Sequence, residues 1–478
     1  MTALRRGWFH LASGAGIGRI FGFLSNLLLS RWLGPIDLGL FNLVTTTVQT
    51  SDTLARCGGD YALNYELGGK PDACQTEHSF ELAHGLAQIC SLMTILTCVC
   101  VATWVWFAQG LFPISLGDTQ RLILTALLLL MIFCEGSSAA AWEVLLVSHR
   151  TGLLSLRQGL FFPLRLFFAA IAALFGGVSG AMLGWTLVAI VQCVWLRRVL
   201  GNLWRPLRVW PLWGSAIRRL LIRGLPFYGS NLLASIIFYP LLIQVATASG
   251  LAEVGYLRVG QILQQIFAFL PATLVPILFL RLRSESSFAD QVALVEKPLR
   301  IIWFVLLEVL LLYCMIDHVL ISWLFGVGFD AALLSTRLLL ITALFECLSQ
   351  IVVQPLLAAG QTRLYGFWQN GSAALAAAIG WFWIPQAGLA AYLIVRMLYV
   401  IIPLIGFGIP VLQNFRQPRK ISLLLLFSVG LLVLVSVQIF LSQFNSSMTA
   451  ALVVPSLVLV VWQRDDLVFF KEALSRRP

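Results

Sequence analysis

The feature that most constrains this chain is a succession of long apolar segments that carry almost no charge. Hydrophobic residues make up 59% of its 478 residues and charged residues only 11%, whereas a soluble domain carries about 25% charged residues. A helix needs about 20 apolar residues to cross a bilayer, and the chain contains about fourteen such segments. The runs lack the short alternating pattern of an outer-membrane barrel. The sequence therefore predicts an all-α polytopic membrane protein.

We expect the membrane spans to be separated by short loops, which leaves no stretch for a sizeable soluble domain. The predicted spans are 11–33, 37–66, 79–108, 120–148, 152–175, 178–197, 219–246, 253–281, 299–316, 332–358, 364–383, 387–411, 421–441 and 448–463.

The sequence also repeats itself. The segment 34–39, Gly-Pro-Ile-Asp-Leu-Gly, returns 216 residues later at 250–255 as Gly-Leu-Ala-Glu-Val-Gly. Further along, at an offset of 211, Glu135 corresponds to Glu346. Two copies of a multi-helix unit predict two lobes with a path between them, which is the plan of a secondary transporter.

The repeat also predicts the domain organisation. We expect an N-terminal six-helix lobe at 1–198 and a C-terminal six-helix lobe at 219–412, joined by a cytoplasmic linker at 199–218. The two spans within 420–463 fall outside the repeat and predict an appended helix pair, followed by a cytoplasmic tail at 464–478.

The net charge of +11 is distributed as in a membrane protein rather than a nucleic-acid-binding one. Basic residues gather in alternate loops, above all in 197–219, whereas the loops 247–252, 384–387 and 442–447 hold no Lys or Arg. By the positive-inside rule, this asymmetry predicts that both termini are cytoplasmic. The nine cysteines and five histidines show no metal-ligand spacing, and no Walker A motif is present. We therefore expect no metal, no cofactor and no catalytic residues.

Two acidic residues lie near the middle of apolar spans, where an ionisable group is costly. Glu135 lies in the span 120–148 and Glu346 in the span 332–358, at equivalent positions of the repeat. This equivalence favours a role in proton or sodium coupling. The alternative interpretation is a structural carboxyl that is hydrogen-bonded to a neighbouring helix.

A charged group in the second span suggests a substrate site. Asp52, Arg56 and Asp60 follow one another at four-residue spacing, which places them on one helix face. An ion-paired ladder near the cytoplasmic surface explains the pattern equally well.

The deeper arginines are candidates for binding an anionic substrate. Guanidinium groups hold phosphate through paired hydrogen bonds. Arg19 and Arg258 are the best candidates, because their spans flank the starts of the repeats, whereas Arg165 and Arg396 could equally pair with an acid.

Three short motifs resemble those of a known family. They are Gly-Arg-Ile at 18–20, Leu-Gly-Pro-Ile-Asp-Leu-Gly-Leu-Phe at 33–41 and Gly-Asp-Tyr-Ala-Leu-Asn-Tyr at 59–65. They resemble the polysaccharide flippases for O-antigen and exopolysaccharide repeat units, within the multidrug/oligosaccharidyl-lipid/polysaccharide exporter superfamily. The resemblance extends over the whole chain through helix number, topology and the two lobes.

The resemblance implies a V-shaped pair of six-helix bundles in the bacterial cytoplasmic membrane. The implied activity moves an undecaprenyl-pyrophosphate-linked oligosaccharide from the inner to the outer leaflet by alternating access. Coupling to a proton or sodium gradient is implied, as is work beside membrane lipids, a polysaccharide polymerase and chain-length machinery. The related lipid II flippases carry an Arg-Asp pair where this chain has Ser25-Asn26, which argues against lipid II as the substrate.

Two other functions compete with this hypothesis. A drug or cation antiporter of the same superfamily would need a cavity richer in acids and aromatic rings than in arginines. A membrane glycosyl polymerase or ligase would be expected to have a long outside loop, and the internal repeat argues against it.

Overall fold

The computed structural model describes the chain in several stretches. They are residues 2–60, 62–63, 77–107, 117–147, 151–201, 216–282, 285 and 287–414. The predicted appended helices at 420–463 and the tail at 464–478 lie outside them, as does most of the predicted linker. The chain forms two compact units, Met1–Arg258 and Val259–Pro478, each described by itself below. The predicted lobe boundaries follow the repeat instead and stay a prediction.

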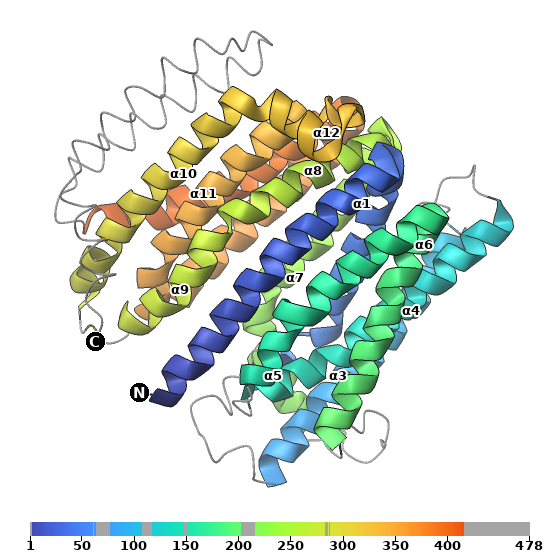
Figure 1. Cartoon of the computed structure of the whole chain (residues 1–478). Helices are drawn as coiled ribbons and strands as arrows, with labels where there is room; N and C mark the ends of the chain where they lie inside the picture. Colours follow the sequence, from blue (N-terminus) through green and yellow to red (C-terminus); the bar gives the residue numbers. More distant parts are fainter. Residues whose placement is uncertain are drawn as a thin grey trace. The chain divides into compact units, whose positions relative to one another are not determined.

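The first unit is a bundle of long helices around α1, which packs along α6, while α3 packs against α4 (Figure 1). The π-helix η2 lies between α5 and α6, and the first turns of α8 belong to this unit. The helices are α1 (Thr2–Arg56), α3 (Glu77–Phe107), α4 (Asp118–Val147), α5 (Thr151–Leu156), η2 (Arg157–Phe161), α6 (Phe162–Leu200), α7 (Ala216–Ser249) and α8 (Leu251–Phe267).

In the second unit, α11 packs against both α10 and α12. The elements are the end of α8, α9 (Phe269–Leu282), α10 (Phe288–Phe325), the 3-10 turn η4 (Val327–Phe329), α11 (Ala332–Ala358) and α12 (Thr362–Leu412).

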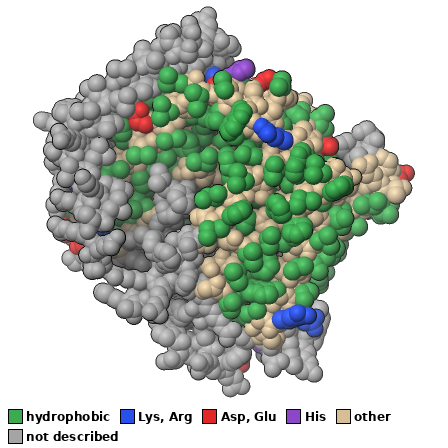
Figure 2. Space-filling view, in the orientation of Figure 1, with side chains coloured by type: hydrophobic (Ala, Val, Ile, Leu, Met, Phe, Trp, Pro, Cys, Tyr) green, Lys and Arg blue, Asp and Glu red, His purple; other side chains and the backbone are tan. Residues whose placement is uncertain are grey.

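The described part of the chain contains helices and turns but no strand. Seven of its helices are long and apolar enough to cross a membrane. Large hydrophobic side chains such as Phe175 and Trp323 are 87% and 68% exposed, and Figure 2 shows hydrophobic side chains over much of one face. Apolar surface of this extent suits lipid rather than water. The prediction of an all-α multi-pass membrane protein is therefore confirmed, and each of the first twelve predicted spans overlaps a described helix.

Three of the long helices are in fact two spans joined at a glycine. The backbone of α1 breaks at Gly34 (φ 69°), that of α6 at Gly177 (φ 55°, ψ −137°) and that of α12 at Gly388 (φ 56°, ψ −133°). Glycine tolerates this left-handed region because it has no Cβ. The sequence places predicted span boundaries next to these residues.

The breaks also follow the internal repeat. Gly177 and Gly388 are separated by the repeat offset of 211 residues and have nearly the same φ and ψ. Gly34 and Gly250 are separated by the offset of 216 residues, and both have positive φ. The repeat in sequence is therefore also a repeat in backbone geometry.

Within the first unit, α1 and the start of α8 cross in close contact. A Cβ on Gly39 would lie 1.9 Å from the carbonyl oxygen of Leu251, and a Cβ on Gly255 would lie 2.0 Å from that of Pro35. The repeat offset of 216 maps Gly39 onto Gly255 and Pro35 onto Leu251. The two contacts are therefore copies of each other, and only glycine fits at both centres.

Two local features differ from the sequence prediction. The predicted span 253–281 is divided into α8 and α9 at Ala268, because Pro271 has no N–H to donate to the carbonyl of Phe267. The span 152–175 contains the π-helical turn η2, a feature that often marks functional sites.

Candidate transport site

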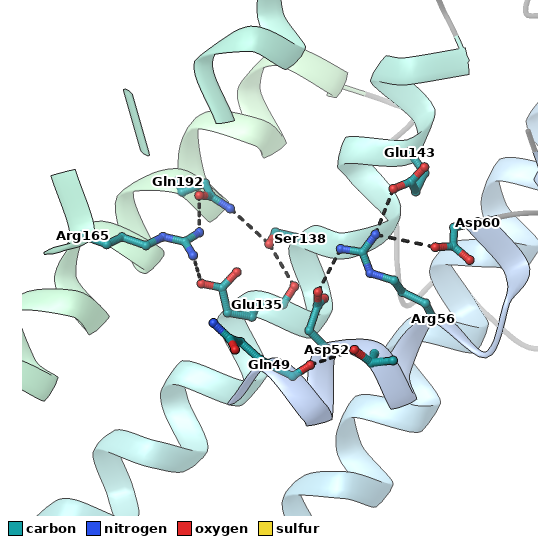
Figure 3. Close-up of polar contacts among 10 residues, drawn as sticks. Gln49, Asp52, Arg56, Asp60, Glu135, Ser138, Glu143, Arg165 and Gln192 are labelled. Carbon is teal, nitrogen blue, oxygen red and sulfur yellow. Dashed lines mark hydrogen bonds and ion pairs between the residues drawn. The ribbon is translucent and has the colours of Figure 1, made fainter. Parts of the chain in front are cut away.

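Arg56, at the end of α1, is surrounded by carboxylates (Figure 3). One guanidinium nitrogen lies 2.9 Å from Asp52 Oδ2, and the other lies 2.9 Å from Glu143 Oε1 on α4 and 3.8 Å from Asp60 Oδ2. The Arg56 side chain is only 13% exposed. The structure thus brings together the three residues that the four-residue spacing singled out, and adds Glu143 from a second helix.

Asp60 reaches Arg56 by a turn rather than along a continuous helix. α1 ends at Arg56, and Cys57 and Gly58 have φ of 45° and 72°. The chain therefore turns before Asp60. The four groups carry three negative charges and one positive charge, so this cluster would suit a cation better than an anion.

A second network joins α4 to both segments of α6. Glu135 forms an ion pair with Arg165, and Arg165 also donates to Gln192 Oε1. Gln192 Nε2 donates to Ser138 Oγ (3.2 Å), whose hydroxyl donates to the carbonyl oxygen of Glu135 (2.9 Å). The Arg165 guanidinium carbon lies 5.8 Å from the ring centre of Trp185. Glu135, predicted to couple ion movement, is thus paired with a cation in this conformation.

The two networks share α4, on which Glu135 and Glu143 lie about two turns apart. Arg157 of η2 lies near both, because the charges of Asp52, Glu135 and Glu143 all act on it. Its guanidinium carbon lies 5.8 Å from the centre of the Trp142 ring. Within the described residues, no group of His, Cys, Asp and Glu is placed to hold a metal ion.

The second unit contains a corresponding but looser arrangement around Glu346 on α11. Gln264 Nε2 of α8 donates to Glu346 Oε2 over 3.0 Å, and Arg396 of α12 donates to Gln264 Oε1 over 3.4 Å. Glu346 therefore accepts a hydrogen bond from a neutral amide, and the amide links it to the arginine.

Arg258 has a different environment from Arg56 and Arg165. It is 9% exposed, and its guanidinium donates to Asn26 Oδ1 on α1 over 3.2 Å. Its Nε has no hydrogen-bond partner among the described residues, and no ion pair joins it to any of them. One turn before it, Val254 accepts a hydrogen bond from Asn42 Nδ2 over 3.4 Å. Arg258 is thus a buried cation with a neutral partner.

Arg19, the other predicted anion-binding residue, lies on α1 and is half-buried. It takes part in polar interactions and is not a free cation. The structure therefore separates the two arginines: Arg258 keeps its charge unbalanced by the described residues, and Arg19 is already engaged.

Several polar residues of these networks were not found from the sequence. Glu143 has the same eight-residue spacing from Glu135 that drew attention to Asp60, so the signal was present. Gln192 and Gln264 are neutral, and nothing in the sequence distinguishes them from other polar residues in apolar spans. Their role is visible only when helices far apart in the chain are packed together.

Kinked, largely apolar helices with charged residues in their interior define a multi-pass protein with a transporter fold. A family model described as polysaccharide biosynthesis protein matches residues 4–280, more than half of the chain. The protein belongs to this family, as the resemblance in three short motifs predicted. No curated protein shows significant similarity.

Solved structures agree with this fold. The chain is similar to the lipid II flippase MurJ in an inward closed conformation, with a TM-score of 0.72 and 12% identity, over 96% of this chain and 99% of that one. It also resembles an outward-facing multidrug resistance MATE family transporter, with a TM-score of 0.55, 15% identity and coverage of 85% and 96%. A transporter of the MOP superfamily from Pyrococcus furiosus gives a TM-score of 0.54, 14% identity and the same coverage. At these identities, the likeness concerns the fold.

Proposed function

We propose that this protein is a flippase that moves undecaprenyl-pyrophosphate-linked oligosaccharides across the bacterial cytoplasmic membrane by alternating access, for surface polysaccharide synthesis. Membership of the polysaccharide biosynthesis family and a fold like that of MurJ support this proposal. The lipid tail would stay in the bilayer while the polar headgroup crosses inside the protein. A desolvated sugar-pyrophosphate would otherwise cost many kcal/mol.

Arg258 is the observation that carries the proposal. A buried guanidinium without a carboxylate partner is costly, unless its partner is a group that comes and goes. Pyrophosphate suits this position, because a guanidinium binds phosphate oxygens through paired, charge-assisted hydrogen bonds. Asn26 supports Arg258 without neutralising it. The substrate would thus supply the negative charge that the described residues withhold.

The remaining features of the proposal concern its setting. Both termini would be cytoplasmic, and the protein would work beside membrane lipids, a polysaccharide polymerase and chain-length machinery. Glu135 and Glu346 are proposed to couple transport to a proton or sodium gradient, with the exchange of partners at Arg165 and Gln264 as the chemical event. Glu→Gln variants of both would then lose the response to an imposed gradient.

Flipping by the purified protein in liposomes tests the proposal. The probe is an undecaprenyl-pyrophosphate oligosaccharide with a fluorescent label, and an impermeant quencher reports the outer-leaflet fraction. Wild type should make the whole pool accessible, and Arg258→Gln should slow this by tenfold or more. Arg218→Gln is the matched control, because Arg218 is exposed at the start of α7. Equal rates in the two variants would refute the assigned role of Arg258.

A cation antiporter is the second candidate, and the cluster around Arg56 is the observation that favours it. Three carboxylates face one guanidinium there. Uptake of ethidium into the same liposomes under a proton gradient, without flipping of the labelled lipid, would favour this alternative.

A further inference from the structure

Glu308 is an acidic residue in the middle of α10 to which no role has been assigned above. It lies eight residues after Arg300 and nine before Asp317, or about 12 and 13 Å along the helix. The residues between these two charged positions are otherwise free of acidic and basic side chains. Because α10 is one of the membrane-spanning helices, Glu308 lies near mid-depth in the bilayer.

The carboxyl group of Glu308 is covered but has no partner. Both of its oxygens are buried, and neither has a hydrogen-bond partner among the described residues. Glu135 and Glu346 differ in this respect, because Glu135 has Arg165 and Glu346 has Gln264.

The elements that pack against α10 provide no charge at the level of Glu308. Trp303 and Phe345, whose ring centres are 6.1 Å apart, and the ion pair of Asp317 with Arg337 fix the register of α10 against α11. Glu308 falls between these two contacts, opposite the stretch 338–345 of α11, in which no residue is ionisable. The nearest ionisable groups of α11 are therefore Arg337, which Asp317 engages, and Glu346.

The other neighbours are also uncharged near Glu308. One turn away on α10 lie Phe304, Val305, Leu311 and Leu312. In α9, the basic residue is Arg281, in the last turn of the helix. The 3-10 turn η4 follows the end of α10 and contains no ionisable residue. Tyr313 and Cys314 are the titratable groups of α10 nearest to Glu308, and Asp317 and Arg300 are its nearest charged ones.

An ionised carboxylate in such surroundings costs about 2.5–3.5 kcal/mol on insertion scales, and buried acids without a counter-charge neutralise instead. We propose that Glu308 is a proton-binding site, held as a carboxylic acid in this conformation and ionised when water reaches it during the transport cycle. The proposal rests on the proposed transport function, and adds a proton-carrying residue to Glu135 and Glu346.

The step is a simple proton transfer. When a change in packing admits water, the O–H bond of the carboxyl breaks, the proton passes to water and a carboxylate remains. When the site opens on the opposite side, the carboxylate takes a proton from water there. A proton gradient would therefore bias the cycle through Glu308.

Infrared spectroscopy of the full-length protein in liposomes tests protonation without any substrate. At neutral pH, wild type should show the carbonyl-stretch band of a buried carboxylic acid, and Glu308→Gln should remove the part due to this residue. Glu285→Gln is the matched control, since Glu285 lies between α9 and α10, outside the apolar span. Glu308→Asp should shift the band rather than remove it. An unchanged band in Glu308→Gln would overturn the proposal.

The flipping assay with the labelled lipid gives the functional readout. A pH gradient should accelerate flipping by wild type and Glu285→Gln, whereas Glu308→Gln should flip without a gradient but show no acceleration. Full acceleration in Glu308→Gln would also overturn the proposal. If no protein flips the probe, wild type included, the proposed flippase function fails, and the infrared band still decides whether Glu308 binds a proton.

Discussion

Replacing Gly39 with alanine should force α1 and α8 apart where they cross. The new Cβ would lie 1.9 Å from the Leu251 carbonyl oxygen, whereas real Cβ contacts are essentially never under 3.0 Å. The two segments must therefore separate by about 1 Å, because the opposing atoms are backbone and no flexible side chain can give way.

The cost falls on conformations that contain the crossing. Overpacking by one methyl group destabilises a packed contact by about 1–3 kcal/mol, and 2 kcal/mol changes a population about thirtyfold. The predicted topology places this crossing near the outer ends of both helices. Gly39→Ala should therefore favour states that are open on the outside.

Cysteine labelling measures this shift. Asn42 is fully buried one turn below Gly39, and its side chain donates to the Val254 carbonyl oxygen. In a chain without the native cysteines, Asn42→Cys should react with an impermeant outside reagent about ten to thirty times faster when Gly39→Ala is also present.

Gly16→Ala is the matched control on the same helix, because a Cβ there would meet no atom within 4 Å. It should leave the labelling rate unchanged. Equal rates with Gly39→Ala and Gly16→Ala would refute the reasoning, since the crossing would then tolerate a methyl group or be absent from the outward-closed state.

Three further predictions concern the charged residues. Arg56→Gln leaves three carboxylates without their cation and should destabilise the protein by about 3–5 kcal/mol, seen as a lower melting temperature in detergent; an unchanged temperature would show that the cluster is not held by Arg56. Glu135→Gln should cost a similar amount by stranding Arg165, and the added change Arg165→Gln should restore part of it; no recovery in the double variant would count against the ion pair. Asn26→Asp should neutralise Arg258 and weaken binding of undecaprenyl pyrophosphate by about tenfold or more, whereas unchanged affinity in a titration would argue against a phosphate site.

The helix order could be predicted from the sequence because it follows from local chemistry. Apolar length defines each span, and glycines such as Gly34 and Gly177 mark the breaks, since few other residues adopt positive φ. The division of α8 from α9 was missed although Pro271 announces it. The π-helical turn at Arg157 was missed because its cause is packing rather than local sequence.

The candidate site was only partly accessible from the sequence. Helical spacing gathered Asp52, Arg56 and Asp60, because that argument needs one segment of chain only. The partners Glu143 and Arg165 come from other helices, and no spacing rule relates them to Arg56 or Glu135. Glu308 was overlooked, even though a single acid in a long apolar run is a signal that the sequence displays openly.

Selective binding of a pyrophosphate lipid at Arg258 is the most direct test of the proposed function. A ligand that binds the folded protein raises its melting temperature, so undecaprenyl pyrophosphate and undecaprenol, which lacks phosphate, can be compared on wild type and Arg258→Gln. The proposal predicts that undecaprenyl pyrophosphate stabilises wild type, that undecaprenol does not, and that Arg258→Gln loses the difference. Equal stabilisation of wild type by both lipids, or an undiminished pyrophosphate effect in Arg258→Gln, would contradict it.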